Sequence, residues 1–335
     1  MPIITSHSPW VINYAIELDR HMSFCGEFFR ASSERQHVVA AYLNARPPRE
    51  CNASLVAEFL LRSRHGEILS AAFQNVPVGL RPALRRAGAV VHPERFYTLL
   101  VELLSCGESY ITRCIAQVPR LDLDALLVIE ALPPEACSPS LIQAVSGSAD
   151  AKDVSTAFHV LVENGVDADW LADCLRDVKT QSSLSSVFQK AARRAIAPPH
   201  PVPASDFYQP IRTGEELFSV AREFRNCLRN YTCSFLDERQ GNAFAVASRA
   251  EHRTVVHLVR GTAGWKLEGL FKSRNRRPSR PTREWIESYL REHGVIIEGR
   301  ETRKPSRWDS VHNLIFGDLL DFQFGFDVDE LDHVV

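Results

Sequence analysis

Cys227 is the strongest single candidate for a reactive residue in this chain. It lies in the segment EFRNCLRNYTCSFLDERQGNAF, residues 223–244. A cysteine nucleophile requires a thiolate, which nearby positive charge stabilises, and a base within hydrogen-bond reach. An arginine lies two residues to either side of Cys227, and His257 is the candidate base. The pattern therefore indicates Cys227 and His257 as candidate catalytic residues of a cysteine-based transferase or hydrolase.

A buried structural thiol is the alternative interpretation of Cys227. The cysteine lies beside Phe224, Leu228 and Tyr231, which recur at helical spacing in the helical region expected from Thr213 to Gly241. Free cysteine is among the most buried residue types and packs as a small apolar side chain. The periodicity favours this interpretation, in which the segment supports a neighbouring sheet.

Zinc binding is the third possibility for the same region. Cys227, Cys233, His252 and His257 follow one another in the order found in zinc fingers. Two helical positions six residues apart point about 240° away from each other. The two histidines are an odd number of residues apart, so on one strand they face opposite sides. We therefore expect no metal site.

A run of basic residues in FKSRNRRPSRPTREW, residues 271–285, indicates phosphate binding. Its prolines favour extended backbone, and guanidinium groups along such a loop can bind successive phosphates. The aromatic residues Phe271, Trp265 and Trp285 could stack on bases if they are exposed. The candidate nucleic-acid-binding or phosphate-binding residues are Lys272, Arg274, Asn275, Arg276, Arg277, Arg280 and Arg283.

The acidic, phenylalanine-rich segment GDLLDFQFGFDVDELDHVV, residues 317–335, allows another role for these charges. It could pair with the basic run and compete with a polyanion, or it could bind a protein partner. The helical region near the start of the chain is a second candidate surface for a protein partner.

The composition excludes several classes of function. A net charge of −2 gives no global field that would attract nucleic acid or a membrane, so any such preference must be local. Charges interrupt every apolar run of the first thirty residues, and the eight cysteines are scattered. We expect a cytoplasmic protein with reduced thiols that does not act at a membrane. The chain has no Walker loop, no dinucleotide fingerprint and no common hydrolase motif, so we expect no cofactor.

The pattern of periodicities predicts an α+β protein. Residues 1–197 are expected to form an all-α bundle or irregular solenoid, followed by a proline-rich linker at 198–210. Residues 211–297 are expected to form a helix, a three-stranded antiparallel meander and a second helix. The expected strands are NAFAVAS, RTVVHLVR and GWKLEGLF. Residues 298–335 form a basic and then acidic C-terminal segment.

The arrangement from 213 to 290 resembles the PcfJ-like domain, which is named after a protein encoded on conjugative plasmids. The residues that match the pattern of this family are Cys227, Tyr231, Gly241 and Asn275. Asn226 stands where the family has a histidine, and Leu228 where it has a valine. The family brings no activity with it, but the resemblance implies a mobile-element or phage-defence context.

Three functions follow as hypotheses. The first is a nucleic-acid-binding or accessory protein of such a system, with the arginine-rich run on phosphate. The second is an enzyme, either the cysteine-based one above or a metal-free nuclease that uses His257 and the basic run. The third is a protein-interaction scaffold.

Overall fold

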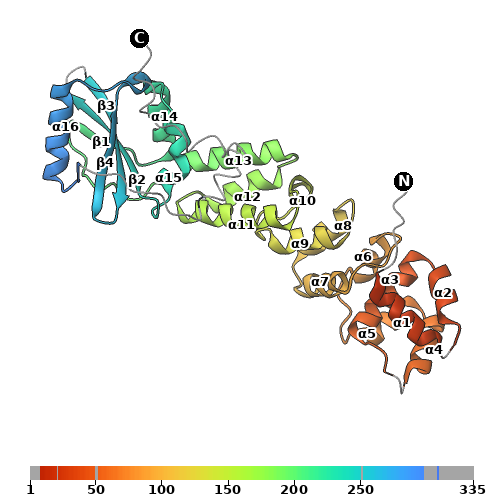
Figure 1. The fold of residues 1–335 in the computed structure, drawn as a ribbon. Coiled ribbons are helices and arrows are strands. Elements are labelled where there is room, and N and C mark those ends of the chain that lie inside the picture. The colour runs from red at the N-terminus through yellow and green to blue at the C-terminus, as the bar shows by residue number, and fades with distance from the viewer. Residues whose placement is uncertain (1–7, 21, 50–51, 250–251, 298–307, 309–335) are drawn as a thin grey trace, which may run out of the picture. The chain divides into compact units, whose positions relative to one another are not determined.

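The structure is a computed structural model that describes residues 8–20, 22–49, 52–249, 252–297 and 308 (Figure 1). The chain divides into two compact units, which meet in sequence between Lys152 and Asp153. No helix among the described residues is long and apolar enough to cross a membrane. The acidic segment 317–335 lies outside the described residues, so its predicted pairing with the basic run stays a prediction.

The first unit is helical. Its helices are α1 (Pro9–Asp19), α2 (Phe24–Arg30), α3 (Ser33–Ala45), α4 (Ala53–Arg62), α5 (His65–Ala72), α6 (Leu80–Arg86), α7 (Glu94–Ser105), α8 (Ser109–Gln117), α9 (Leu123–Ala131) and α10 (Pro139–Ala144). Helix α11 (Ser148–Glu163) begins in this unit and ends in the next. Every residue from Gln36 to Leu43 in α3 is buried, so α3 is the central helix against which its neighbours pack.

The second unit contains the sheet. Its further elements are α12 (Ala168–Arg176), α13 (Gln181–Arg194), β1 (Tyr208–Pro210), α14 (Gly214–Phe224), η2 (Leu228–Tyr231), α15 (Thr232–Leu236), β2 (Asn242–Arg249), β3 (His252–Gly261), β4 (Gly264–Phe271), η3 (Ser273–Asn275) and α16 (Arg280–Glu292). The predicted α+β class is confirmed, and the three predicted strands are β2, β3 and β4.

The sheet has a fourth strand that the sequence did not indicate. The strand order is β1-β2-β3-β4, and all neighbours are antiparallel. Strand β1 comes from the expected linker 198–210 and pairs with β2, with Tyr208 opposite Ala247. Pro210 is tolerated there because β1 is an edge strand, whose outer side requires no ladder hydrogen bonds.

The two faces of the sheet carry different helices (Figure 1). Helix α16 covers the face that contains Ala243, Ala245 and Val256, through Ile286 and Leu290. The opposite face carries Phe244, which packs against Phe235 of α15. Helices α14 and α15 lie on this second side (Figure 1), and Tyr231 of η2 packs on Phe244. The alternation along β2 follows from the two-residue period of a strand.

The helical region expected from Thr213 to Gly241 is interrupted. Thr213 is the N-cap as predicted, and its side chain accepts a hydrogen bond from the Glu216 amide at 3.2 Å. Helix α14 nevertheless ends at Phe224, because Arg225 adopts a left-handed conformation with φ 51°. The chain then turns and continues as η2 and α15, so residues after Arg225 do not follow the apolar stripe of α14.

Candidate functional site

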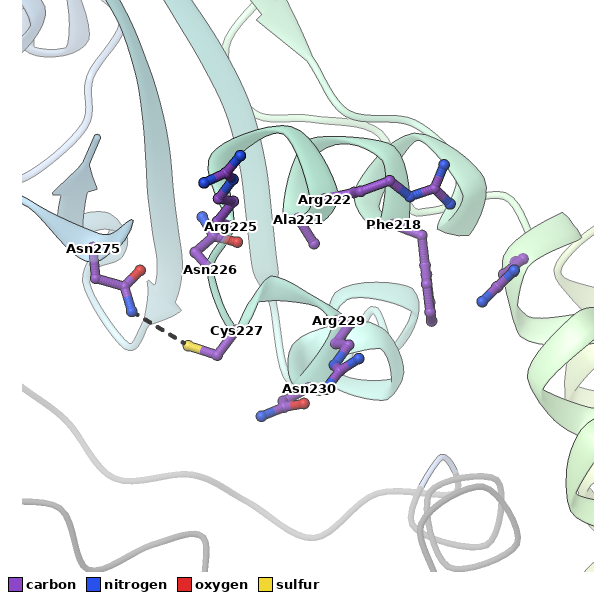
Figure 2. Close-up of a pocket in the computed structure, with 10 residues that line it drawn as sticks. Phe218, Ala221, Arg222, Arg225, Asn226, Cys227, Arg229, Asn230 and Asn275 are labelled. Atoms are coloured by element: carbon purple, nitrogen blue, oxygen red, sulfur yellow. Dashed lines mark hydrogen bonds between the residues drawn. The ribbon is translucent and has the colours of Figure 1, made fainter. Parts of the chain in front are cut away.

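A pocket of about 470 Å³ lies beside the carboxyl end of α14 (Figure 2). Helix α13 contributes Arg193, α14 and the turn after it contribute the largest part, and η2 and η3 complete the wall. The polar residues that line the pocket are Arg193, Arg222, Arg225, Asn226, Cys227, Arg229, Asn230 and Asn275. Phe218 and Ala221 are its apolar residues.

The backbone around the pocket is strained. In the described part of the chain, three residues other than glycine have positive φ: Arg225 (51°), Arg274 (60°) and Asn275 (57°). Arg225 and Asn275 line the pocket, and Arg274 is adjacent in sequence. Left-handed backbone costs about 1–2 kcal/mol for such a residue, and residues held in it cluster at functional sites. The strain therefore marks this corner of the second unit as a candidate site.

Cys227 is not buried, which corrects the structural-thiol interpretation. Its side chain is exposed and lies in the pocket, because the break at Arg225 turns it away from the apolar stripe of α14. Its Sγ accepts a hydrogen bond from Asn275 Nδ2 at 3.9 Å (Figure 2). Two of the residues that carry the resemblance to the PcfJ-like domain thus meet in the fold, although 48 positions separate them.

His257 has partners other than Cys227 in the described part of the chain. Its Nε2 lies 2.7 Å from Asn242 Oδ1, and its ring stacks on Phe244 with 4.3 Å between the ring centroids. Tyr231 packs on the histidine from the side of η2. Burial lowers the pKa of His257 to about 3, so the ring is neutral near pH 7. The contacts given for Cys227 and His257 in the described residues include no hydrogen bond between them, so the structure does not assemble the expected catalytic pair.

The zinc alternative gains no support from the geometry. Cys233 is buried, whereas His252 is exposed at the start of β3. Among the residues that the structure describes, no group of three or more metal-ligating side chains is arranged to hold an ion.

The arginine-rich run separates into two parts. Arg274, Arg276 and Arg277 are exposed in the loop between β4 and α16, and no carboxylate of the described residues forms an ion pair with them. The Lys272 amide donates to the Arg276 carbonyl at 2.7 Å, which closes this turn. Arg280 and Arg283 lie on α16 and pair with carboxylates one turn further on, at 2.7 and 2.6 Å. We call Arg274, Arg276 and Arg277 the loop arginines.

The expected stacking surfaces are not freely available. Trp285 is half-buried and packs against Phe207, with 5.3 Å between the ring centroids. Trp265 is also half-buried against the hydrophobic core below α16. Neither tryptophan is fully exposed, so each offers only part of its ring to a base.

The pocket is strongly positive. Four arginines line it, which we call the pocket arginines: Arg193, Arg222, Arg225 and Arg229. No acidic residue is among its lining residues, and no ion pair with a described carboxylate is formed by any of the four. The carboxyl end of α14 adds a partial negative charge of about half a unit, which four guanidinium groups outweigh.

Arg193 is the most firmly held of the pocket arginines. Its guanidinium carbon lies 4.3 Å from the centroid of the Phe218 ring, which is cation–π geometry. Its Nε is buried and has no hydrogen-bond partner among the described residues. Arg193 reaches the pocket because α13 packs closely on α14 at Gly214, where an added Cβ would lie 2.1 Å from the Ala192 carbonyl oxygen.

Sequence reasoning identified Arg225 and Arg229 only as positive charge beside Cys227, and it missed Arg193, Arg222 and the pocket that the four arginines share. Arg222, Arg225 and Arg229 follow each other at three and four residues, a spacing that could have indicated one basic surface. Arg193 carries no such signal, since it lies on a separate helix. Only the packing of α13 on α14 brings it to the others.

The exposure of the cysteines predicts the order in which they react. Under native conditions we expect iodoacetamide to modify Cys227 and Cys106, whose side chains are exposed. Cys114, Cys137 and Cys233 are buried and should react only after unfolding. Peptide mass spectrometry of the labelled protein measures each site separately. Slow native labelling of Cys227, at the rate of Cys233, would contradict the exposed position described above.

Comparison with known proteins adds nothing to the resemblance to the PcfJ-like domain, which rests on Cys227, Tyr231, Gly241 and Asn275. No protein-family model matches the chain, and neither a curated protein nor a solved structure matches it.

Proposed function

We propose that the second unit binds nucleic acid through its phosphates, as part of the mobile-element or phage-defence context that the PcfJ-like resemblance implies. The observation that carries the proposal is a collection of arginines that form no ion pair with any carboxylate of the described residues. The four pocket arginines and the three loop arginines belong to it. Asn275 links the two groups, because it lines the pocket and lies within the arginine-rich loop.

Positive charge that no described carboxylate neutralises favours a polyanion as the ligand. A guanidinium group makes bidentate hydrogen bonds with phosphate oxygens, and each neutralised phosphate releases counterions from the nucleic acid. The proposal concerns phosphate contacts, which position a protein on a strand but do not read its sequence. It therefore leads us to expect binding with little sequence preference.

Removal of the loop arginines is expected to weaken binding steeply. The triple substitution Arg274→Ala, Arg276→Ala and Arg277→Ala should reduce affinity for a labelled oligonucleotide about 10- to 100-fold at low salt. It should also lower the slope of log K against log salt by about one for each phosphate contact that is lost. Fluorescence anisotropy with DNA and RNA oligonucleotides, single- and double-stranded, measures both quantities.

The matched control uses arginines that already have partners. Arg280→Ala, Arg283→Ala and Arg291→Ala remove the same charge from α16, where each arginine pairs with a carboxylate. This triple variant is expected to keep its affinity within about threefold, because the three arginines already pair with Glu284 or Glu287 and are less available to phosphates. An equal loss in both variants, or no binding of any oligonucleotide at low salt, would reject the proposal.

A further inference from the structure

We propose that the pocket binds a phosphomonoester, the terminal phosphate of a nucleotide or of a nucleic-acid strand end. This proposal rests on the proposed function and specifies the chemical group that the pocket binds. A free nucleotide and a strand end both present this group, which is a phosphate attached to a nucleoside by a single ester bond.

The pocket and the arginine-rich loop differ in shape and therefore suit different ligands. The loop arginines are exposed and can follow a continuous backbone, whose phosphodiesters lie on the outside of a strand. The pocket has a volume of about 470 Å³, within the range of small-molecule sites, and is partly open to solvent. Its size suits a compact terminal group, which can present three phosphate oxygens to the arginines at once.

Charge also distinguishes a phosphomonoester from a backbone phosphodiester. A phosphomonoester carries about 1.5 to 2 negative charges near neutral pH and has three terminal oxygens, whereas a backbone phosphodiester carries a single charge. Four pocket arginines, with no acidic residue among the described residues that line the pocket, match the larger charge. Asn226, Asn230 and Asn275 add carboxamide groups that can donate to the remaining oxygens or to a sugar hydroxyl.

Contacts within the protein hold several donors of the pocket in place. Arg193 is fixed on Phe218, and its buried Nε lacks an acceptor among the described residues. Arg225 and Asn275 both have left-handed backbone conformations, and the Asn275 side chain also donates a hydrogen bond to Cys227 Sγ. Donors that are placed before the ligand arrives lose less conformational freedom on binding. This arrangement supports selective capture of a terminal phosphate over weak contact with any anion.

The test compares one oligonucleotide with different ends. A single-stranded 12-mer with a 5′-phosphate, a 3′-phosphate or hydroxyls at both ends is titrated into the full chain by fluorescence anisotropy, with the label inside the strand. We expect at least a tenfold higher affinity for one of the phosphorylated forms. A nucleoside monophosphate should compete with it, the corresponding nucleoside should not, and inorganic phosphate should compete more weakly.

Variants assign the preference to the pocket. The double substitution Arg222→Ala and Arg229→Ala changes exposed side chains and should abolish the preference for the phosphorylated end, so that all three forms bind with the same, reduced affinity. The loop triple variant should weaken all forms by a similar factor. The double variant Arg20→Ala and Arg239→Ala removes the same charge from exposed positions outside the pocket, and it should retain the preference.

A second measurement does not depend on oligonucleotide binding. A nucleoside monophosphate should protect Cys227 from iodoacetamide, and Cys106, exposed in the first unit, is the internal control. Equal affinity for phosphorylated and hydroxyl ends, together with unprotected Cys227, would overturn the phosphomonoester site while nucleic-acid binding stands. Protection of Cys227 by the nucleotide without binding of any oligonucleotide would support the site and reject nucleic-acid binding.

Discussion

The unfolding free energy of the second unit is expected to fall by about 3 kcal/mol between pH 6.5 and pH 4 through His257 alone. Burial lowers the pKa of this histidine to about 3 in the folded chain, against 6.5 for an unperturbed histidine. Between these values the unfolded chain binds a proton that the folded chain does not. The contribution of His257 to the unfolding free energy is therefore fully present above pH 6.5 and is lost as the pH falls toward 3.

The variant His257→Gln isolates this effect. Glutamine does not titrate and can still donate to Asn242, but it loses the stacking on Phe244. We expect it to be less stable than the original chain at pH 7.5 and to lose less stability toward pH 4. Urea titrations followed by tryptophan fluorescence measure the difference, since four of the five tryptophans lie in the second unit.

His252→Gln is the matched control for this experiment. It makes the same substitution at an exposed position of the same strand. The control should retain the steep dependence on pH, which comes from His257. If His257→Gln lost stability toward pH 4 as steeply as the original chain, the buried, neutral histidine would not be its source.

Gly214→Ala is expected to destabilise the second unit by about 3 kcal/mol, because it overpacks a contact between two backbones. The added Cβ would lie 2.1 Å from the Ala192 carbonyl oxygen and 2.8 Å from the Arg193 Cα. Both atoms belong to the backbone of α13, so no side chain can move to make room. The helix must shift as a whole, and Arg193 must move away from Phe218 with it.

Gly66→Ala is the control for the glycine substitution. Gly66 lies in α5, and an added Cβ would meet no atom within 4 Å. This variant should be neutral or more stable by up to about 1 kcal/mol, because alanine favours the helix. Urea titrations measure both variants. The Gly214→Ala chain should also lose affinity for the phosphorylated oligonucleotide, and unchanged affinity would show that Arg193 is not needed there.

The sheet and its helices were predictable because their signals are local. Alternation along β2 and β3, the cap at Thr213 and the turns between the strands all lie within a few residues of one another. Strand β1 was not predictable, because Pro210 argues against a strand unless the segment is known to lie at an edge. Its position at the edge depends on pairing with β2, which is a contact between distant segments.

The pocket was not predictable for a related reason. Helical periodicity placed Cys227 on the apolar side of one long helix, and no glycine or proline near Arg225 indicates that the helix ends there. A left-handed arginine is stabilised by its surroundings and carries no signal in its own sequence. The loop arginines were recognised from composition, but composition does not show that Arg280 and Arg283 have partners on α16.

The contact between Asn275 and Cys227 also sets when the pocket can exist during folding. Its walls come from residues as distant as Arg193 and Asn275, and the strands β2, β3 and β4 of the antiparallel sheet lie between Cys227 and Asn275 in the chain. Pairing of distant segments is the slow part of folding for such topologies. A nascent chain that ends before Asn275 therefore lacks a complete pocket. Occupation of the pocket would then select finished molecules, and at 100 times Kd a ligand would protect them from proteolysis with about 2.7 kcal/mol of added stability.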